Sequence, residues 1–363
     1  MRYKTLIVIT VISIVLQSCV LGERRVESGI DDVYMYSVWN GVMLKYNIET
    51  GTATAVCDDP FCKHDDDTCM FNNINPSICI KNQIMYYCKY NSEGNANIIS
   101  YNMKTGESRT IFTNADVDEL FVADSYLFFW NRVYSAEKKC FHSELMRYDI
   151  NSKKTEKLIN CSIEERAFYI DNNDELIFWY NNYGQEFSTD YNYKNITHVD
   201  SMGRGNGNYV YQLTRNYETS KNYHEANSRS LYRINKDLGE KCKICEDLDN
   251  YIIIGEKIIY LTSVEDPNVV FRSSVDESDV YYNNYEGYVW KMDLDGANKE
   301  ILCKVDCNIY GLFVSPNESL LVKDNYVGFM LYDYLFDGTY GISPNILIVN
   351  TVSGSYKITE SHF

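Results

Sequence analysis

The sequence predicts an all-β protein built as a β-propeller, a ring of four-stranded antiparallel blades. Six copies of one short pattern lead to this prediction: an apolar residue, two further residues, an aromatic or apolar residue, and then Asn or Asp. The copies end at Asn47, Asn102, Asp149, Asn235, Asp293 and Asn350. Tyrosine is abundant, with 33 of 363 residues, whereas there are only 5 prolines, and this composition favours strands. A pattern that recurs at such intervals along the chain indicates an array of similar structural units.

Each copy is expected to form the outer hairpin of one blade. In the second copy, residues 97–103 make one strand, residues 104–106 turn, and residues 107–112 return. A glycine follows every copy except the third, which suits a turn residue with positive φ, and the Asn or Asp can accept amide hydrogen bonds there. Because the third copy has Lys153 where the others have glycine, we expect a different turn at that position.

Two more strands precede the hairpin in copies two to six, so the repeating unit has four antiparallel strands, named A to D in chain order. Such units are the blades of propellers. The residues before the Asn or Asp lie 47 to 58 positions apart, except for a gap of 86 between Tyr148 and Ile234. We favour six blades with an insertion in that gap. The alternative is seven blades, with a degenerate blade within residues 183–230.

The first residues read as a targeting segment. Arg2 and Lys4 precede an apolar run over residues 6–16, which is too short to span a bilayer and fits a signal peptide. The run ends in Leu16-Gln-Ser-Cys19, which resembles the lipobox of bacterial lipoproteins. That resemblance implies acylation of Cys19, and an ordinary secretory signal is the alternative. The expected organisation is a signal peptide over residues 1–18, an acylated tether over 19–30 and a propeller over 31–363.

The formal net charge is −17, which argues against nucleic acid as a partner. The expected location is the extracytoplasmic face of a bacterial cell membrane, to which the lipid anchor attaches the protein. Acyl chains on the first residue of the mature chain would supply this attachment.

One face of the ring is expected to bind a ligand. Because strands alternate in direction, B–C and D–A connections share one face, and the A–B and C–D turns share the other. The longest connections are all expected on the B–C and D–A face: residues 57–77, 181–230, about 264–286 and about 324–344. They are rich in tyrosine, which offers large contact area with a polar tip. The candidate ligand residues are Tyr183, Tyr191, Tyr193, Tyr217, Tyr223, Tyr281, Tyr282, Tyr285, Tyr334 and Tyr340.

A cysteine-rich segment follows the first hairpin. Cys57, Cys62, His64 and Cys69 lie within thirteen residues. Three thiolates and an imidazole suit a tetrahedral zinc site, whereas disulfides are the usual use of cysteine outside the cell. We favour a disulfide here, and zinc or free thiols are the alternatives.

The signal segment, the repeated Tyr-Asn or Tyr-Asp hairpins and the segment from Cys57 to Cys69 together resemble a family of uncharacterised lipoproteins from clostridial and related Gram-positive bacteria. Their repeats are similar to the propeller of the low-density-lipoprotein-receptor-related proteins, although the Tyr-Trp-Thr-Asp signature of those propellers is absent here. The resemblance implies a fold and a location, and it implies no established reaction.

These observations predict a membrane-anchored propeller that binds a protein, peptide or glycan through its long-loop face. The alternative is an enzyme, a propeller-type polysaccharide lyase or hydrolase with its active site at the mouth of the central channel. We favour the binding protein because no nucleophile motif or spaced pair of histidine ligands occurs in the sequence. An enzyme would bring His, Arg and carboxylate side chains together near the channel.

Overall fold

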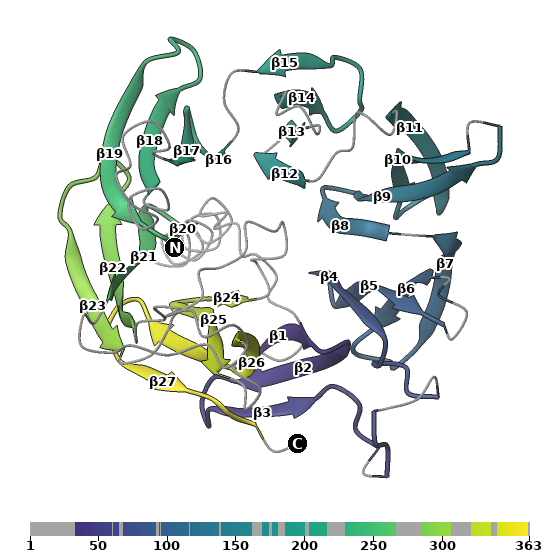
Figure 1. Ribbon diagram of the computed structural model, residues 1–363, viewed down its shortest axis with the longest axis horizontal. Coiled ribbons are helices and arrows are strands. Elements are labelled where there is room, and N and C mark those ends of the chain that lie inside the picture. The colour runs from purple at the N-terminus through teal and green to yellow at the C-terminus, as the bar shows by residue number, and fades with distance from the viewer. Residues whose placement is uncertain are drawn as a thin grey trace, which may run out of the picture.

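Seven four-stranded sheets form the ring in the computed structural model (Figure 1). It describes residues 33–59, 61–64, 68–91, 94, 96–115, 117–137, 139–161, 169–173, 176–180, 186–199, 203–215, 229–265, 285–305, 321–334 and 340–361. The prediction of a propeller with four-stranded blades is confirmed. The favoured number of six blades is wrong, because the alternative of seven is what the chain forms.

The strands follow one another around the ring in chain order, apart from the last. Blade 1 contains β1 (Tyr34–Trp39), β2 (Val42–Asn47), β3 (Thr52–Ala55) and β28 (Glu360–Ser361). Blades 2 and 3 contain β4 (Ile74–Lys81), β5 (Ile84–Tyr90), β6 (Ala96–Asn102), β7 (Ser108–Ala115), β8 (Val117–Ala123), β9 (Tyr126–Ser135), β10 (Cys140–Asp149) and β11 (Lys154–Cys161). Blades 4 and 5 contain β12 (Tyr169–Asn173), β13 (Leu176–Tyr180), β14 (Glu186–Asp190), β15 (Thr197–Val199), β16 (Arg204–Asn206), β17 (Tyr209–Arg215), β18 (Arg229–Asn235) and β19 (Lys241–Leu248). Blades 6 and 7 contain β20 (Asn250–Ile254), β21 (Lys257–Glu265), β22 (Tyr285–Asp293), β23 (Glu300–Val305), β24 (Val322–Lys323), β25 (Tyr326–Tyr334), β26 (Tyr340–Asn350) and β27 (Tyr356–Ile358).

Blade 4 fills the long gap between the third and fourth copies of the pattern. Its C strand β14 ends in Thr189-Asp190, so Asp190 occupies the pattern's Asn/Asp position while a buried threonine replaces the aromatic residue. The predicted insertion over residues 181–230 is therefore wrong, because β14 to β17 lie within it. The predicted insertion over residues 324–344 is also wrong, because the B strand β25 and the beginning of the C strand β26 occupy most of it.

The Asn or Asp of the pattern organises the C–D turns. The side-chain oxygen of Asn102 accepts hydrogen bonds from the amides of Lys104 and Thr105, at 2.9 and 3.1 Å. The same pair of bonds occurs at Asn47, Asp149, Asn235 and Asn350. The prediction that these side chains accept amide hydrogen bonds is therefore confirmed at these five turns.

The third copy does not change turn type, contrary to the prediction. Lys153 takes the positive φ of 59° that glycine takes in the other copies, and its amide donates to the carbonyl of Asp149 at 2.8 Å. The equivalent bond from Gly106 to Asn102 also measures 2.8 Å. The turn is thus kept, and a lysine adopts a conformation that L-residues rarely adopt.

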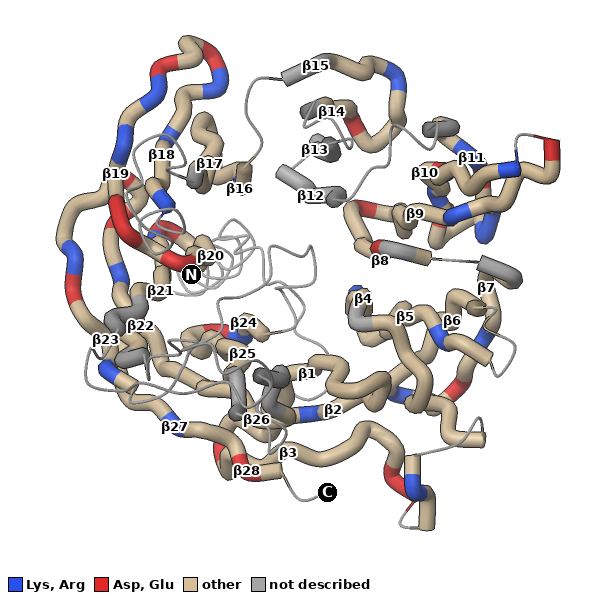
Figure 2. The backbone as a smooth tube through the Cα atoms, in the orientation of Figure 1, with Lys and Arg blue, Asp and Glu red and all other residues tan. Residues whose placement is uncertain are grey.

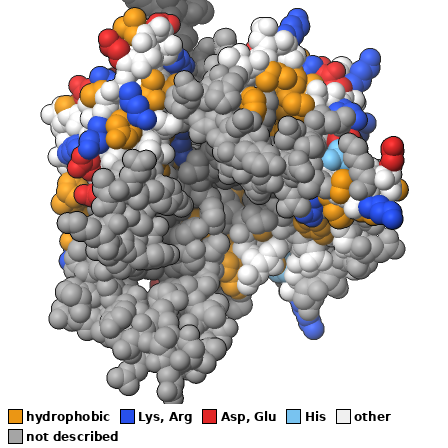
Figure 3. Space-filling view, turned by 45° about the horizontal axis from the view of Figure 1, so that its top comes forward, with side chains coloured by type: hydrophobic (Ala, Val, Ile, Leu, Met, Phe, Trp, Pro, Cys, Tyr) orange, Lys and Arg blue, Asp and Glu red, His pale blue; other side chains and the backbone are white. Residues whose placement is uncertain are grey.

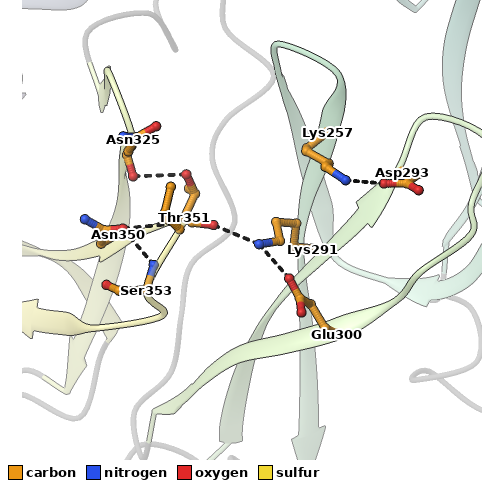
Figure 4. A network of polar contacts seen from close by, with 9 residues as sticks. Lys257, Lys291, Asp293, Glu300, Asn325, Asn350, Thr351 and Ser353 are labelled. Atoms are coloured by element: carbon orange, nitrogen blue, oxygen red, sulfur yellow. Dashed lines mark hydrogen bonds and ion pairs between the residues drawn. The ribbon is translucent and has the colours of Figure 1, made fainter.

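The hydrophobic core lies between the faces of neighbouring blades. Cys79 and Cys88 of blade 2, for example, are buried together with Leu120 and Phe129 of blade 3. Polar contacts join blades at their outer ends. Lys291 of blade 6 donates to the carbonyl of Thr351 in blade 7 at 3.1 Å (Figure 4). Charged residues recur along the outer strands β11, β19 and β23 (Figure 2).

The end of the described chain closes the ring. Strand β2 carries the Tyr46-Asn47 copy of the pattern, so β1, β2 and β3 correspond to strands B, C and D, and β28 supplies the fourth strand of blade 1. It runs parallel to β3, with Glu360 opposite Thr52. Met35, Leu44 and Tyr46 of blade 1 share a buried cluster with Val327 and Phe329 of blade 7. No helix in the described ranges is long and apolar enough to cross a membrane.

Candidate metal centre and groove

The cysteine-rich segment connects β3 to β4, from the D strand of blade 1 to the A strand of blade 2. Backbone hydrogen bonds hold both of its ends against the β1–β2 hairpin. The amide of Val56 donates to the carbonyl of Met43 at 2.9 Å, the amide of Met43 donates to Phe71 at 3.1 Å, and the amide of Ile74 donates to Gly41 at 2.9 Å. As a D–A connection, the segment lies on the ring face that also carries the B–C connections.

Two side chains anchor the segment in the core. Cys69 and Phe71 are buried in a cluster with Met43, Tyr87 and other residues of blades 1 and 2. The Phe71 ring meets the edge of Tyr101 with ring centroids 5.1 Å apart. Such aromatic pairs add to the stabilisation that burial gives. The segment therefore has an apolar attachment at its C-terminal end, and the cysteines upstream fold over it.

Four potential metal ligands converge in this segment. The sulfur atoms of Cys57, Cys62 and Cys69 and a ring nitrogen of His64 all lie within 4.8 Å of one another. The Nδ1 atom of His64 is 3.3 Å from the sulfur of Cys69. Tetrahedral zinc, with Zn–S bonds of about 2.3 Å, places its sulfur ligands about 3.8 Å apart. The cluster could therefore hold a metal ion after small side-chain movements.

Cys57, Cys62 and Cys69 are free thiols in this structure. The predicted disulfide is therefore not formed among them, and the four side chains are arranged around a common point.

The environment of Cys69 disfavours its deprotonated form when no metal ion is bound. Burial raises the pKa of Cys69 to about 12, and the neighbouring thiols of Cys62 and Cys57 act in the same direction. The amide of Phe71 opposes this by donating a hydrogen bond to the sulfur. Three thiolates packed this closely require a compensating cation, and metal binding releases their protons. The chemistry of the donor set thus fits a soft divalent ion such as Zn²⁺.

The backbone around the cluster supports this arrangement. His64 has a positive φ of 57°, a conformation that non-glycine residues seldom adopt outside turns and functional sites. Asp59 caps the turn before it, since its carboxylate accepts the amide of Phe61 and its carbonyl accepts the amide of Cys62. Lys89 donates to the carbonyl of Cys69 at 2.5 Å. This lysine places a positive charge beside the cluster.

A groove of about 630 Å³ opens beside the cluster. Trp39 pairs with Val42, and Leu44 with Ala55, so these four side chains form an apolar row on one face of blade 1. The rim is polar: Lys45, Asp58, Asp59 and Lys63 line it together with Cys57, Cys62 and His64. Lys45 and Asp58 form an ion pair of 2.8 Å across this rim. Pockets of this volume hold small ligands or short peptide segments.

No sequence motif marks Trp39, Val42 or Lys45 as site residues. They belong to the first copy of the repeat, and only the strand register brings them to the cysteine segment. No local signal distinguishes them from equivalent strand residues in other blades.

The predicted tyrosine face is only partly described. Tyr285, Tyr334 and Tyr340 lie where β22, β25 and β26 meet the B–C connections, as expected. Tyr183, Tyr217, Tyr223, Tyr281 and Tyr282, and also Cys19, lie outside the described residues.

Tyr191 and Tyr193 do not lie on the predicted face. They occupy the turn between β14 and β15, a C–D turn, and such turns share the opposite face of the ring. Both pack against the buried cluster around Phe128, and the Tyr191 ring lies 6.3 Å from the Phe128 ring. The error follows from the missed fourth blade, because Tyr191 and Tyr193 fell within an assumed B–C insertion.

No protein family and no curated protein sequence matches this chain. Solved structures are similar in fold. The β-propeller domain of the Trilobed protease from Pyrococcus furiosus superposes with a TM-score of 0.51 at 16% identity, over 78% of this chain and 82% of that one. Oligogalacturonate lyase from Vibrio parahaemolyticus superposes with a TM-score of 0.50 at 11% identity, over 86% of this chain and 91% of that one.

TolB from Acinetobacter baumannii is a more distant structural match. Its TM-score is 0.43 at 12% identity, over 74% of this chain, and the chain spans 63% of the TolB chain. At their low identities, the two matches with TM-scores of 0.50 and 0.51 establish the propeller fold alone.

Proposed function

We propose that this protein is a lipid-anchored lipoprotein on the extracytoplasmic face of a bacterial membrane, where it binds a protein, peptide or glycan. The binding face is the one that carries the B–C and D–A connections. A zinc ion held by Cys57, Cys62, His64 and Cys69 shapes one side of the binding groove. The apolar segment before Cys19 supports the location, and acylation of Cys19 supplies the anchor.

One observation carries the proposal: four ligand atoms within 4.8 Å of one another border the groove beside Trp39. Four protein ligands complete a tetrahedral site, which is the coordination of structural zinc; catalytic zinc keeps one position open. The ion would fix the connection that forms the polar rim. Bound zinc and three thiolates carry a net charge of −1, and Lys89 lies close enough to offset it.

The role as a polysaccharide lyase or hydrolase remains the competing proposal. It requires His, Arg and carboxylate side chains that converge near the central channel. Within the described ranges, the group of His, Cys, Asp or Glu side chains with metal-binding geometry is the cysteine cluster, and it lies in a D–A connection.

Metal analysis of the full chain, purified in detergent without chelators, tests the zinc centre. We expect about one zinc ion per chain, as for a single tetrahedral site. In Cys69→Ser we expect the affinity for zinc to fall by more than about tenfold, because one ligand is lost. Cys79→Ser is the matched control, because Cys79 is equally buried in the core but lies in β4, outside the cluster. Chelation should expose three additional thiols to titration. A metal-free protein in which two of Cys57, Cys62 and Cys69 resist titration until reduced would show that a disulfide occupies the segment.

Arrays of peptides and glycans, probed with the same preparation, test the binding role. We expect binding that weakens when Trp39→Ala removes the aromatic wall of the groove, while Tyr356→Ala, which removes an exposed aromatic side chain of β27 beside a C–D turn, leaves it unchanged. Binding that is insensitive to Trp39→Ala would place the ligand elsewhere on the ring. Depolymerisation of a polysaccharide on the array would favour the enzyme.

A further inference from the structure

The described part of the chain enters its first strand on one of the two faces of the ring. The amide of Ile48, in the C–D turn of blade 1, donates to the carbonyl of Val33 at 2.8 Å. Tyr34 pairs with Asn47 at the same end of the hairpin. The chain therefore enters β1 on the A–B and C–D face, which we call the turn face. The cysteine cluster and groove lie at the other end of these strands, about 17–20 Å away for a six-residue strand.

Exposed apolar side chains lie on both faces of the ring, Phe61 and Tyr134 among them on the groove face, and those of the turn face recur from blade to blade. Leu238 and Val352 are 68% and 69% exposed, and they lie in the C–D turns of blades 5 and 7. Ile196 in the C–D turn of blade 4 and Ile301, just after that of blade 6, are about half exposed, at 49% and 51%. Single exposed apolar residues are ordinary on protein surfaces. Here four successive blades each present one at the same end.

Lysines accompany these apolar residues. The C–D turns of blades 2 to 6 each carry an exposed lysine, namely Lys104, Lys153, Lys194, Lys236 and Lys299. The same seven turns carry five acidic residues, namely Glu49, Glu107, Asp237, Glu240 and Asp295, so the turns are neutral overall, whereas the whole chain has a net charge of −17. Over the described surface in Figure 3, cationic and anionic side chains are interspersed with apolar ones.

From these observations we infer that the turn face rests on the anionic lipid surface that carries the anchor, and that the groove faces away from the membrane. The inference rests on the proposed acylation of Cys19. Apolar residues at turn tips can enter the headgroup region, and neighbouring lysines are attracted to anionic lipids. An anchor joined to the same face holds the turn residues at a high effective concentration near the lipid surface. Their weak contacts therefore need only set the orientation of the propeller.

The orientation fits the binding role. A groove on the far side of the ring meets partners in the surrounding wall or medium, whereas a groove against the bilayer would be blocked. The other possible occupant of the turn face is a membrane-associated protein. It would protect the same turns without any contact between them and lipid, and the experiment separates the two.

The test uses the full acylated chain in vesicles of phosphatidylcholine and phosphatidylglycerol, some with brominated acyl chains that quench tryptophan. Leu238→Trp and Val352→Trp place probes on the turn face, and Phe61→Trp places one on the cysteine segment, where Phe61 is 90% exposed. The signal of the four native tryptophans is subtracted by using the parental chain. We expect quenching of the probes at 238 and 352 by about twofold or more, as for shallow insertion, and no added quenching at 61.

Flotation of the same vesicles separates the anchor from the orientation. A chain that fails to float with vesicles overturns the proposed anchor and, with it, this inference. A chain that floats but shows quenching only at 61 lies the other way up. A chain that floats with no probe quenched is held away from the lipid, which leaves the anchor intact and overturns the orientation.

Discussion

The amide of Glu360 donates a hydrogen bond of 2.9 Å to the carbonyl of Gly51, and this bond joins the last described strand to the first blade. It belongs to the parallel pairing of β28 with β3. Lys357 adds a second link, since its ammonium group donates to the carbonyl of Glu49 at 2.6 Å. Ring closure in this propeller therefore depends on a short segment of backbone pairing and on the apolar packing between blades 1 and 7.

Replacing Glu360 with proline removes the donor and leaves the Gly51 carbonyl without its partner. We expect the free energy of unfolding to fall by about 1–3 kcal/mol, the usual effect of leaving a polar group unpaired. The denaturant midpoint of the purified chain measures this. Glu360→Ala retains the amide and should stay within about 0.5 kcal/mol of the parental chain. If alanine and proline lower the midpoint equally, then the carboxylate and not the backbone bond is important.

The third C–D turn offers a substitution that should stabilise the protein. Lys153 has a φ of 59°, where a side chain costs roughly 1–2 kcal/mol and glycine does not. Because glycine is also more disordered when unfolded, we expect Lys153→Gly to raise the free energy of unfolding by up to about 1 kcal/mol.

Gly106→Ala is the matched control for the turn. Gly106 has a φ of 72° at the equivalent position, and an added Cβ would meet only the Tyr101 hydroxyl, at 3.9 Å. This change should destabilise the protein by about 1 kcal/mol through the backbone alone. If Lys153→Gly and Gly106→Ala shifted the thermal midpoint in the same direction, the two turns would not share one conformation.

The sequence predicts each blade in which the pattern keeps its residue types. It does not reveal blade 4, in which those residue types change. Blade 4 escaped because Glu186 replaces the apolar residue and Thr189 the aromatic one, although Asp190 was still in place. Its turn is also atypical, since Tyr193 takes the positive φ of 59° in place of glycine. Its spacing gave no help either, because Asp190 lies 41 residues after Asp149 and 45 before Asn235, closer than the 47 to 58 residues that separate the other copies.

For the candidate site, the sequence gives the composition but not the geometry. The spacing of Cys57, Cys62, His64 and Cys69 is compatible with a disulfide or a metal site. The convergence depends on contacts with residues that are distant in the sequence, such as the amide of Met43 donating to Phe71, and on the positive φ of His64. These are tertiary and backbone features that no residue pattern encodes.

A substitution at Thr189, in the C strand of blade 4, should increase the stability of the protein. Its hydroxyl is buried without a hydrogen-bond partner, and its side chain is 1% exposed. We expect Thr189→Val to raise the free energy of unfolding by about 1 kcal/mol, because valine has the same shape and no unpaired oxygen. Thr359 is the control, since it is equally buried but its hydroxyl accepts the amide of Ile346 at 2.9 Å. Thr359→Val should destabilise by about 1–3 kcal/mol, and a destabilising effect at both positions would show that Thr189 has an unseen partner.

Asp149 makes the third turn sensitive to acid, whereas asparagine holds the equivalent turns of blades 1, 2, 5 and 7. The amide of Ser152 donates to its carboxylate at 2.9 Å and, together with the amide of Asn151, lowers the pKa of Asp149 below its usual value. A lowered pKa in the folded state means that this carboxylate contributes stability above its unfolded pKa of about 3.9. That contribution disappears as the pH falls through the lower folded pKa.

Asp149→Asn keeps the hydrogen-bond acceptor but cannot titrate. We therefore expect the parental chain to be at least as stable as this variant near neutral pH, and the difference in free energy of unfolding to shrink steadily below about pH 4. Denaturant unfolding of both proteins from pH 7 to pH 3 measures the difference directly. A difference that stays constant across this range would mean that the two amides bind the charged and neutral side chains equally, and that the turn is held by its backbone bond from Lys153 to Asp149 alone.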